Sequence, residues 1–445
     1  MYDAVYIESM KKPTATLHYQ YFSNDCASAM TNKGMPALRV VPEPVVPECT
    51  VKDEIQAGIE GAMGDIVTVL TKPLTADEAS PKAKAAETPP RIIFKGDVAE
   101  VNRFFYQRGW ADGLPVIPPT DQAVAEMLTG TDLPANHQVA EMGPRRGKVT
   151  VEKIAINAVM AGALPTYMPV LIAAVKALDA GGAGPIMMSA STGSFAPVWI
   201  ISGPIRNDLH VNSYYGAFSP GEMANSAIGR AMRLIVQNMR GVRRGMEDMG
   251  VLGNPGKFAM VIAENEEASP WEPLHVERGL NKEDSAITYM YSQSFRQFMA
   301  YGTDDNGILS TVAYNMSPGS MGSIWFVVTP VNAKALASRG WTKKSINDFV
   351  VRNASAPRKH FSRFYTEADT AENRELLPIF APPPGGQQSS RPQPNQVQVV
   401  VCGGMGVWVG VLSGGQSGTA KIELPANWSK LVAKYKTVVP TFAKY

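Results

Sequence analysis

The sequence has few cysteines and no excess of charge of either sign. Its three cysteines, Cys26, Cys49 and Cys402, are too few and too scattered for a disulfide framework or a four-thiolate zinc site. Lys plus Arg number 42 against 40 Asp plus Glu, which leaves a net charge of +2. Such a chain has no overall field to attract nucleic acid or an anionic membrane. These absences exclude polyanion binding as the main function and favour a reducing, cytoplasmic setting.

Long hydrophobic runs and common catalytic motifs are also missing. No stretch reaches the roughly 18 apolar residues that a membrane span needs. The N-terminal segment carries lysines and acids where a signal peptide has its apolar core. The chain has no Walker phosphate loop and no G-x-S-x-G nucleophile elbow. We therefore expect a cytoplasmic protein without a membrane segment, and neither P-loop nucleotide binding nor serine-esterase chemistry.

Composition places the chain among folded globular proteins. Hydrophobic residues make up 45% of it and charged residues only 18%, below the usual quarter, so we expect surface to be covered in a homo-oligomer. Two segments rich in proline and small residues indicate joints between folded parts. The expected parts are a small N-terminal α/β unit (1–80), a linker (81–90), a central body (91–380), a Pro-rich tether (381–396) and a β-rich C-terminal module (397–445).

Apolar runs alternate with helical patterns in the central body, which predicts an α/β fold of mixed sheet-and-helix layers. The runs typical of buried strands are 91–94, 198–201, 258–263 and 324–329. The helices expected here begin after the caps Thr150, Ser219 and Thr342. The helix after Ser219 should present Arg230, Arg233 and Gln237 on a polar face. Two β-rich runs around Gly403-Gly404 predict a hairpin at a sheet edge.

The densest group of ionisable residues follows a predicted strand, at residues 264–278. Strand ends are where α/β folds place their sites, and histidine and carboxylates can move protons near neutral pH. The expected catalytic residues are His275, Glu272 and Glu267, with Trp271 against the substrate. Glu264, Glu267 and His275 could instead hold a divalent metal. The alternative is a solvated acidic loop anchored by Trp271.

Basic and small residues supply candidate anion contacts. Arg145, Arg146 and Arg206 are expected to orient an anionic substrate, because arginine presents a fork of donors to carboxylate or phosphate. The strings of small residues at 189–195 and 317–322 could wrap an anion with backbone amides. The alternative for all of these is a set of ordinary solvated turns and loops.

Three strings carry a family resemblance: WADGLPVIPPT at 110–120, TVEKIAINAVMAG at 150–162 and AENEEASPWEPLH at 263–275. On these strings the chain resembles a bacterial family associated with UGSC-motif, selenoprotein-related proteins, over roughly residues 40 to 440. The resemblance implies a thiol or selenol redox association. The sequence departs from it in having no Cys-Gly-Ser-Cys string, so a partner subunit bearing a thiol, or a bound cofactor, would have to supply that chemistry.

Two functions follow as expectations. The first is an enzyme subunit that acts on a small polar or anionic molecule by carboxylate and histidine acid–base chemistry or with a metal, as a lyase, hydrolase or oxidoreductase. The second is a non-catalytic assembly subunit whose C-terminal module reaches over a neighbour. The two differ in one structural respect: an enzyme should gather acidic and basic side chains around one pocket.

Overall fold

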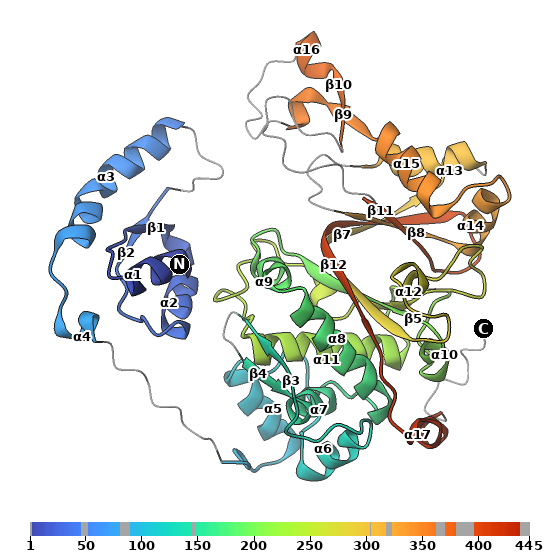
Figure 1. The fold of residues 1–445 in the computed structure, drawn as a ribbon, viewed down its shortest axis with the longest axis horizontal. Coiled ribbons are helices and arrows are strands. Elements are labelled where there is room, and N and C mark those ends of the chain that lie inside the picture. Colours follow the sequence, from blue (N-terminus) through green and yellow to red (C-terminus); the bar gives the residue numbers. More distant parts are fainter. Residues whose placement is uncertain are drawn as a thin grey trace.

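A six-stranded mixed sheet forms the centre of the fold (Figure 1). The computed structural model describes residues 2–45, 52–80, 90–143, 147–302, 304–316, 323–361, 370–379 and 396–436. The strand order is β11-β8-β12-β7-β5-β6. The strands are β5 (Ala196–Ser202), β6 (Val261–Ala263), β7 (Ala286–Met299), β8 (Ile324–Val328), β11 (Val397–Val401) and β12 (Trp408–Lys421). This layered sheet with helices confirms the predicted α/β class.

The sheet curls so that its two halves face each other. Alternate residues of β5 point to opposite sides: Val198 packs into a core shared with Trp325 of β8, whereas Trp199 packs into the core under the helices. The long strands β7 and β12 pair with each other along both halves and connect them (Figure 1). Where the outer strands end, the Asn265 N–H donates to the Val401 carbonyl at 2.8 Å. The six strands thus form a partly closed barrel with an apolar interior.

Helices cover the outer face of each half. One group lies on the half formed by β5, β6 and β7, where α8 contacts β7 and β12, α9 contacts β12, α11 contacts β6, and α7 packs on α8 and α11: α7 (Val151–Met160), α8 (Met168–Ala180), α9 (Ala183–Ala190) and α11 (Met223–Ile235), which continues as a π-helical turn (Val236–Arg240). A second group packs on β8 and β11: α13 (Asp305–Tyr314), α14 (Pro330–Ala337) and α15 (Lys343–Asn353). Further elements of the body are α5 (Val98–Gln107), α6 (Asp121–Leu128), β3 (Gln138–Met142), β4 (Gly147–Thr150), α10 (Ile205–Asp208), α12 (Leu274–Glu277), β9 (Ser355–Pro357), α16 (Ala371–Arg374), β10 (Leu376–Pro378) and α17 (Trp428–Tyr435).

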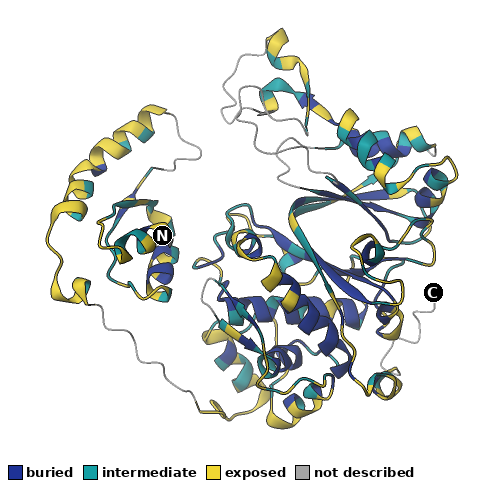
Figure 2. Ribbon diagram, viewed as in Figure 1, coloured by how far each residue is buried: buried dark blue, intermediate teal, exposed yellow. Residues whose placement is uncertain are grey.

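The N-terminal unit touches the body through a polar contact. It consists of α1 (Tyr2–Ser9), β1 (Thr16–Tyr19), α2 (Ser23–Asn32), β2 (Val40–Glu43), α3 (Lys52–Thr71) and α4 (Ala76–Ala79). The Ser28 hydroxyl of α2 donates to Glu247 at 2.6 Å, and both residues are buried. In contrast, α3 is largely exposed (Figure 2).

Several local predictions are confirmed and others are wrong. Thr150 and Thr342 cap α7 and α15 as expected, each accepting a backbone N–H. The helix predicted after the cap Ser219 begins three residues later, at Met223, because Gly221 has φ +148°, which is not a helical conformation. The run at 91–94 forms no strand.

The predicted C-terminal hairpin is also wrong. β11 and β12 do not pair with each other, since β8 lies between them, and β12 is an interior strand. The two β-rich runs of the expected C-terminal module are therefore strands of the central sheet.

No single helix among the described residues is both long and apolar enough to cross a bilayer. In the same part of the chain, one pair of segments reaches that length and composition together: Pro165–Ala180 and Ala183–Ala190, which are bent at 99° to one another.

Candidate functional site

The predicted acidic loop lies at the carboxyl ends of β5 and β6. Glu264 is fully buried, and its Oε2 accepts hydrogen bonds from the Ser202 hydroxyl at 3.0 Å and from the Leu274 N–H at 2.7 Å. Its Oε1 has no hydrogen-bond partner, and the nearest cation, Lys343 Nζ, is 3.8 Å away. Burial raises the pKa of Glu264 to about 7, although Lys343 and the Leu274 amide oppose the shift. This carboxyl therefore titrates near neutral pH.

Arg206 brings two further glutamates of the loop together. Its guanidinium is buried, with Nη2 at 2.5 Å from Glu267 and Nε at 3.2 Å from Glu266. Glu267 is exposed on its other side, and the hydrogen bond from Arg206 lowers its pKa to about 2. Glu266 also accepts from the Gly203 N–H. Arg206 is thus occupied by protein carboxylates, which is incompatible with its predicted role of holding a substrate anion.

His275, which is buried, and Trp271, which is partly buried, anchor this loop. His275 is fully buried, with Nε2 3.3 Å from the Lys282 carbonyl and Nδ1 3.9 Å from Glu266. The Trp271 indole N–H donates to the Trp341 carbonyl at 2.8 Å. The Trp271 ring packs on the core that α13, α14 and α15 share with β8 and β11. Glu272 is exposed, and its carbonyl accepts from Lys343.

The predicted metal ligands do not converge. Within the described residues, no group of three or more His, Cys, Asp or Glu side chains is placed to hold a metal ion. The set Glu264, Glu267 and His275 is therefore wrong as a ligand set, because Glu267 turns outward to Arg206 and His275 faces a backbone carbonyl. Arg145, Arg146 and the string 317–322 lie outside the described residues.

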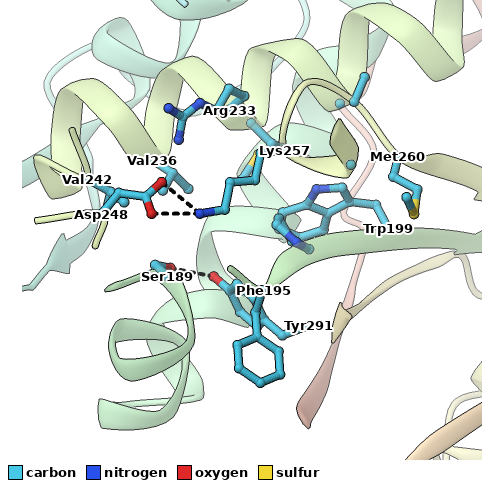
Figure 3. A pocket seen from close by; sticks show the side chains of 15 residues that line it. Ser189, Phe195, Trp199, Arg233, Val236, Val242, Asp248, Lys257, Met260 and Tyr291 are labelled. Carbon is cyan, nitrogen blue, oxygen red and sulfur yellow. Dashed lines mark hydrogen bonds and ion pairs between the residues drawn. The ribbon is translucent and has the colours of Figure 1, made fainter. Parts of the chain in front are cut away.

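A pocket lies at the opposite end of β5 (Figure 3). It is shallow: its free space comes to about 410 Å³ only when the open solvent at its mouth is counted. Its walls come from α9, α11, β5, β7 and the segment before β6. The lining is mostly apolar or aromatic, with four polar side chains: Ser189, Arg233, Asp248 and Lys257. Such a lining, apolar with a few convergent polar groups, is typical of small-molecule sites.

Lys257 and Asp248 form a shielded ion pair in this pocket. Lys257 Nζ lies 2.7 Å from both Asp248 oxygens. The local sequence fixes Lys257: Asn254 caps the short 3₁₀ helix Pro255–Lys257 and donates to the carbonyls of Ser292 and Gln293 on β7. The position of Lys257 is therefore set by the backbone around it.

Arg233 is the unpaired cation of the pocket. It projects from α11 on the same side as the Lys257–Asp248 pair (Figure 3). Among the described residues it has neither a hydrogen-bond acceptor nor an ion-pair partner, and Asp248 and Asp112 act on it only at longer range. Burial lowers its pKa. Its nitrogens are not among the buried atoms that lack a partner, so water can reach them, and an anion bound here would meet paired donors.

A buried arginine beside the pocket bonds only neutral groups among the described residues. Arg240, which is 2% exposed, donates to the carbonyls of Gly143 and Pro185 and to the Ser189 hydroxyl. Ser189 in turn lies 2.8 Å from the Tyr291 hydroxyl. Arg240 ends the π-helical turn, a geometry that is frequent at functional sites.

The segment around residues 110–120 is hydrogen-bonded to α11 and the π-helical turn, which line the pocket. Arg230 of α11 makes two 2.9 Å bonds to the buried carboxylate of Asp112. Gln237 and Asn238 of the π-helical turn donate to the carbonyls of Gly109, Ala111 and Trp110. These bonds hold the end of α11, and with it Arg233, in place.

Sequence reasoning missed most of the pocket. It placed Arg233 on a polar helix face and named Ser189 within a candidate anion-wrapping string, and both line the pocket. Lys257, Asp248 and Tyr291 were not expected. The only signal for Lys257 was its turn sequence, Asn254-Pro255-Gly256.

The two described cysteines lie apart from the pocket. Cys26 and Cys402 are both buried and free. Burial raises the pKa of Cys402 to about 12 and also raises that of Cys26. Neither thiol is therefore in a form that favours nucleophilic chemistry.

Comparisons with known proteins identify no relative of this chain. No protein-family model matches this chain, and neither a curated protein nor a solved structure is significantly similar to it.

Proposed function

We propose that this chain is an enzyme subunit that binds a small organic anion in the Arg233–Lys257 pocket and acts on it by proton transfer. The observation that carries the proposal is Arg233, a partly buried cation with no partner among the described residues, on the wall of a pocket. A bound carboxylate would supply the missing counter-charge and accept the paired donors of the guanidinium. The proposed substrate is still a small anion, as expected from the sequence. Its proposed binding site is this pocket and not the acidic loop.

Proton transfer is assigned to the Lys257–Asp248 pair. The Asp248 carboxylate would be the base that takes a proton from the substrate and returns it, and the Lys257 ammonium would orient that carboxylate and direct its remaining N–H donor into the pocket. Glu264 and His275 act as supports for the loop after β6, since both are fully buried beneath it.

The test is equilibrium binding by calorimetry with a panel of small carboxylates, followed by NMR of the bound compounds in D₂O. We expect Arg233→Gln to weaken binding at least about tenfold, the loss of one charged hydrogen bond. Arg244→Gln removes an exposed arginine of the neighbouring loop and serves as the matched control. Lys257→Met should keep binding measurable but abolish exchange of substrate hydrogen for deuterium. Equal affinities of the Arg233→Gln and wild-type proteins would reject the site.

An assembly role is the second candidate, and the N-terminal unit favours it. One face of α3 exposes Ile59, Met63, Val67 and Leu70, at helical spacings of four, four and three. A second copy of this chain is a suitable partner, because a net charge of +2 gives little repulsion between copies. Light scattering of wild-type protein and of Met63→Glu tests this role: an unchanged mass would reject it.

A further inference from the structure

The N-terminal unit contacts the body beside the pocket. The Ser28 hydroxyl of α2 donates to Glu247 Oε1 at 2.6 Å, and the next residue, Asp248, is the carboxylate of the pocket lining. We infer that this contact lets the N-terminal unit regulate the pocket: α2, docked on the loop at residues 243–248, holds Asp248 in place beside Lys257. The inference rests on the proposed function, since it takes Asp248 to be the base that acts on the substrate.

The 243–248 loop is a compact hydrogen-bonded turn, so a shift at Glu247 reaches Asp248. The N–H groups of Glu247 and Asp248 both donate to the Arg243 carbonyl, at 3.1 and 2.9 Å. The Arg243 guanidinium in turn holds the Glu247 carboxylate, with Nη2 2.9 Å from Oε1. The same Oε1 accepts the hydrogen bond from Ser28. One carboxylate oxygen therefore joins α2 to the turn that carries Asp248.

This turn depends on outside support because part of it faces solvent. Arg244 and Gly245 are exposed, and exposed loops open at a low cost in free energy. The bond from Ser28 to Glu247 joins two buried residues, and its acceptor is charged, which places it among the stronger hydrogen bonds. Release of α2 would therefore raise the population of open conformations in which Asp248 no longer faces Lys257.

A contact between like charges opposes the docking of α2. Asp25 precedes Ser28 by three residues on α2, so the two lie on the same face of the helix. Burial and the charge of Glu247 raise the pKa of Asp25 to about 6, and the N-terminal amino group of the chain opposes this shift. The part of the shift that comes from Glu247 exists only while α2 is docked.

The sign of the pH dependence follows from this contact. A raised pKa means that the docked form holds a proton on Asp25 which the released form gives up, so docking weakens as the pH rises through about 6. The other ionisable groups here are Arg243, which pairs with Glu247, and the Cys26 thiol, whose pKa is raised by burial and by Asp25. Repulsion between Asp25 and Glu247 therefore makes the docking reversible near neutral pH.

The experiment is hydrogen exchange followed by mass spectrometry on the full chain, measured on peptides that cover residues 243–248. At pH 5 we expect Ser28→Ala to exchange at least about tenfold faster there than wild type, and Ser28→Thr, which keeps the hydroxyl, to exchange more slowly than Ser28→Ala. Thr31→Ala removes an exposed hydroxyl that bonds within α2 and is the matched control. Asp25→Asn removes the repulsion and should exchange more slowly than wild type at pH 7.

The outcomes separate this inference from the proposed function. If Ser28→Ala and wild type exchange equally in the loop, the N-terminal unit does not hold Asp248 and the inference is overturned, whereas carboxylate binding that depends on Arg233 still stands. If the loop exchanges faster but no carboxylate of the panel binds in a manner that depends on Arg233, both proposals fail.

If the loop exchanges faster and a carboxylate binds, its turnover decides the regulatory role. Deuterium incorporation into that carboxylate at pH 7 should fall at least about twofold in Ser28→Ala and recover in Ser28→Thr, with the affinity unchanged. Equal incorporation by Ser28→Ala and wild type would show that docking does not regulate the pocket.

Discussion

The Lys257 ammonium lies 2.7 Å from both carboxylate oxygens of Asp248, and the two side chains are only 14% and 8% exposed. The pair joins two segments that border the pocket: the loop that follows the π-helical turn, and the 3₁₀ helix before β6. It therefore both organises the site and contributes to the stability of this edge of the barrel.

Removing one member of this pair should destabilise the fold. Asp248→Asn leaves a shielded ammonium without its counter-charge, and we expect a loss of about 3 kcal/mol in the free energy of unfolding. Urea denaturation followed by circular dichroism measures it. The matched control is Asp348→Asn, which breaks the exposed pair with Lys344 and should leave stability unchanged. Equal stability of the two variants would contradict a structural role for the Lys257–Asp248 pair.

Glu264 should make stability depend on pH. Its pKa in the folded protein is raised to about 7 from the ordinary value of 4.5, so the folded state holds a proton that the unfolded state releases. The contribution of this group to stability is then complete below about pH 4.5 and is lost as the pH rises to about 7, by on the order of 3 kcal/mol.

The measurement is the urea midpoint at several pH values for wild-type protein and Glu264→Gln. The amide keeps an acceptor for Ser202 and the Leu274 N–H but does not titrate, so the variant should lose the decline between pH 4.5 and 7. Asp25, whose pKa is raised to about 6 by burial and by Glu247, contributes in the same direction to both proteins and cancels in the difference. Glu423→Gln changes an exposed carboxylate and is the control. Parallel curves for Glu264→Gln and wild type would contradict the assignment.

His275→Ala should affect stability and not ligand binding. The ring is fully buried at the carboxyl end of β6, away from the pocket, and its removal should cost about 2 kcal/mol through the cavity it leaves. Thermal unfolding and titration of the same sample with the panel of small carboxylates measure both effects. The exposed His137 offers a control, His137→Ala. A folded His275→Ala protein that binds substrate but no longer turns it over would restore the catalytic assignment of His275.

The buried thiols should react slowly in the native state. In a Cys49→Ser background, only Cys26 and Cys402 remain, and burial raises the pKa of each. Ellman's reagent should therefore modify neither of them until the protein is unfolded in urea. Rapid release of one equivalent from native protein would show an accessible thiol and would support redox chemistry within this chain.

Truncation before β11 should prevent folding. Removing residues 397–445 deletes β11 and the interior strand β12, which pairs with both β7 and β8. We expect insoluble or unfolded protein, measured by far-ultraviolet circular dichroism after expression. A folded, soluble fragment of lower oligomeric state would instead support the earlier expectation of a detachable arm.

Local signals in the sequence predicted much of the secondary structure. Thr150 and Thr342 act as helix caps because the geometry of a cap involves only neighbouring residues. The runs at 198–201 and 324–329 lie in buried strands since their composition suits a sheet covered on both faces. Gly221 misled the prediction for α11, because its positive φ depends on the chain around it.

The sequence by itself determined the α/β class, the positions of these caps and strands, and the acidic loop that follows β6. Only the tertiary structure decided that β12 is an interior strand and that Arg206 is occupied by Glu266 and Glu267. It also decided that Arg233, distant in sequence from Ser189 and Tyr291, shares a pocket with them. The reason is physical: caps and turns depend on contacts between neighbours, whereas the pairing of a charge depends on which distant segments the curled sheet brings together.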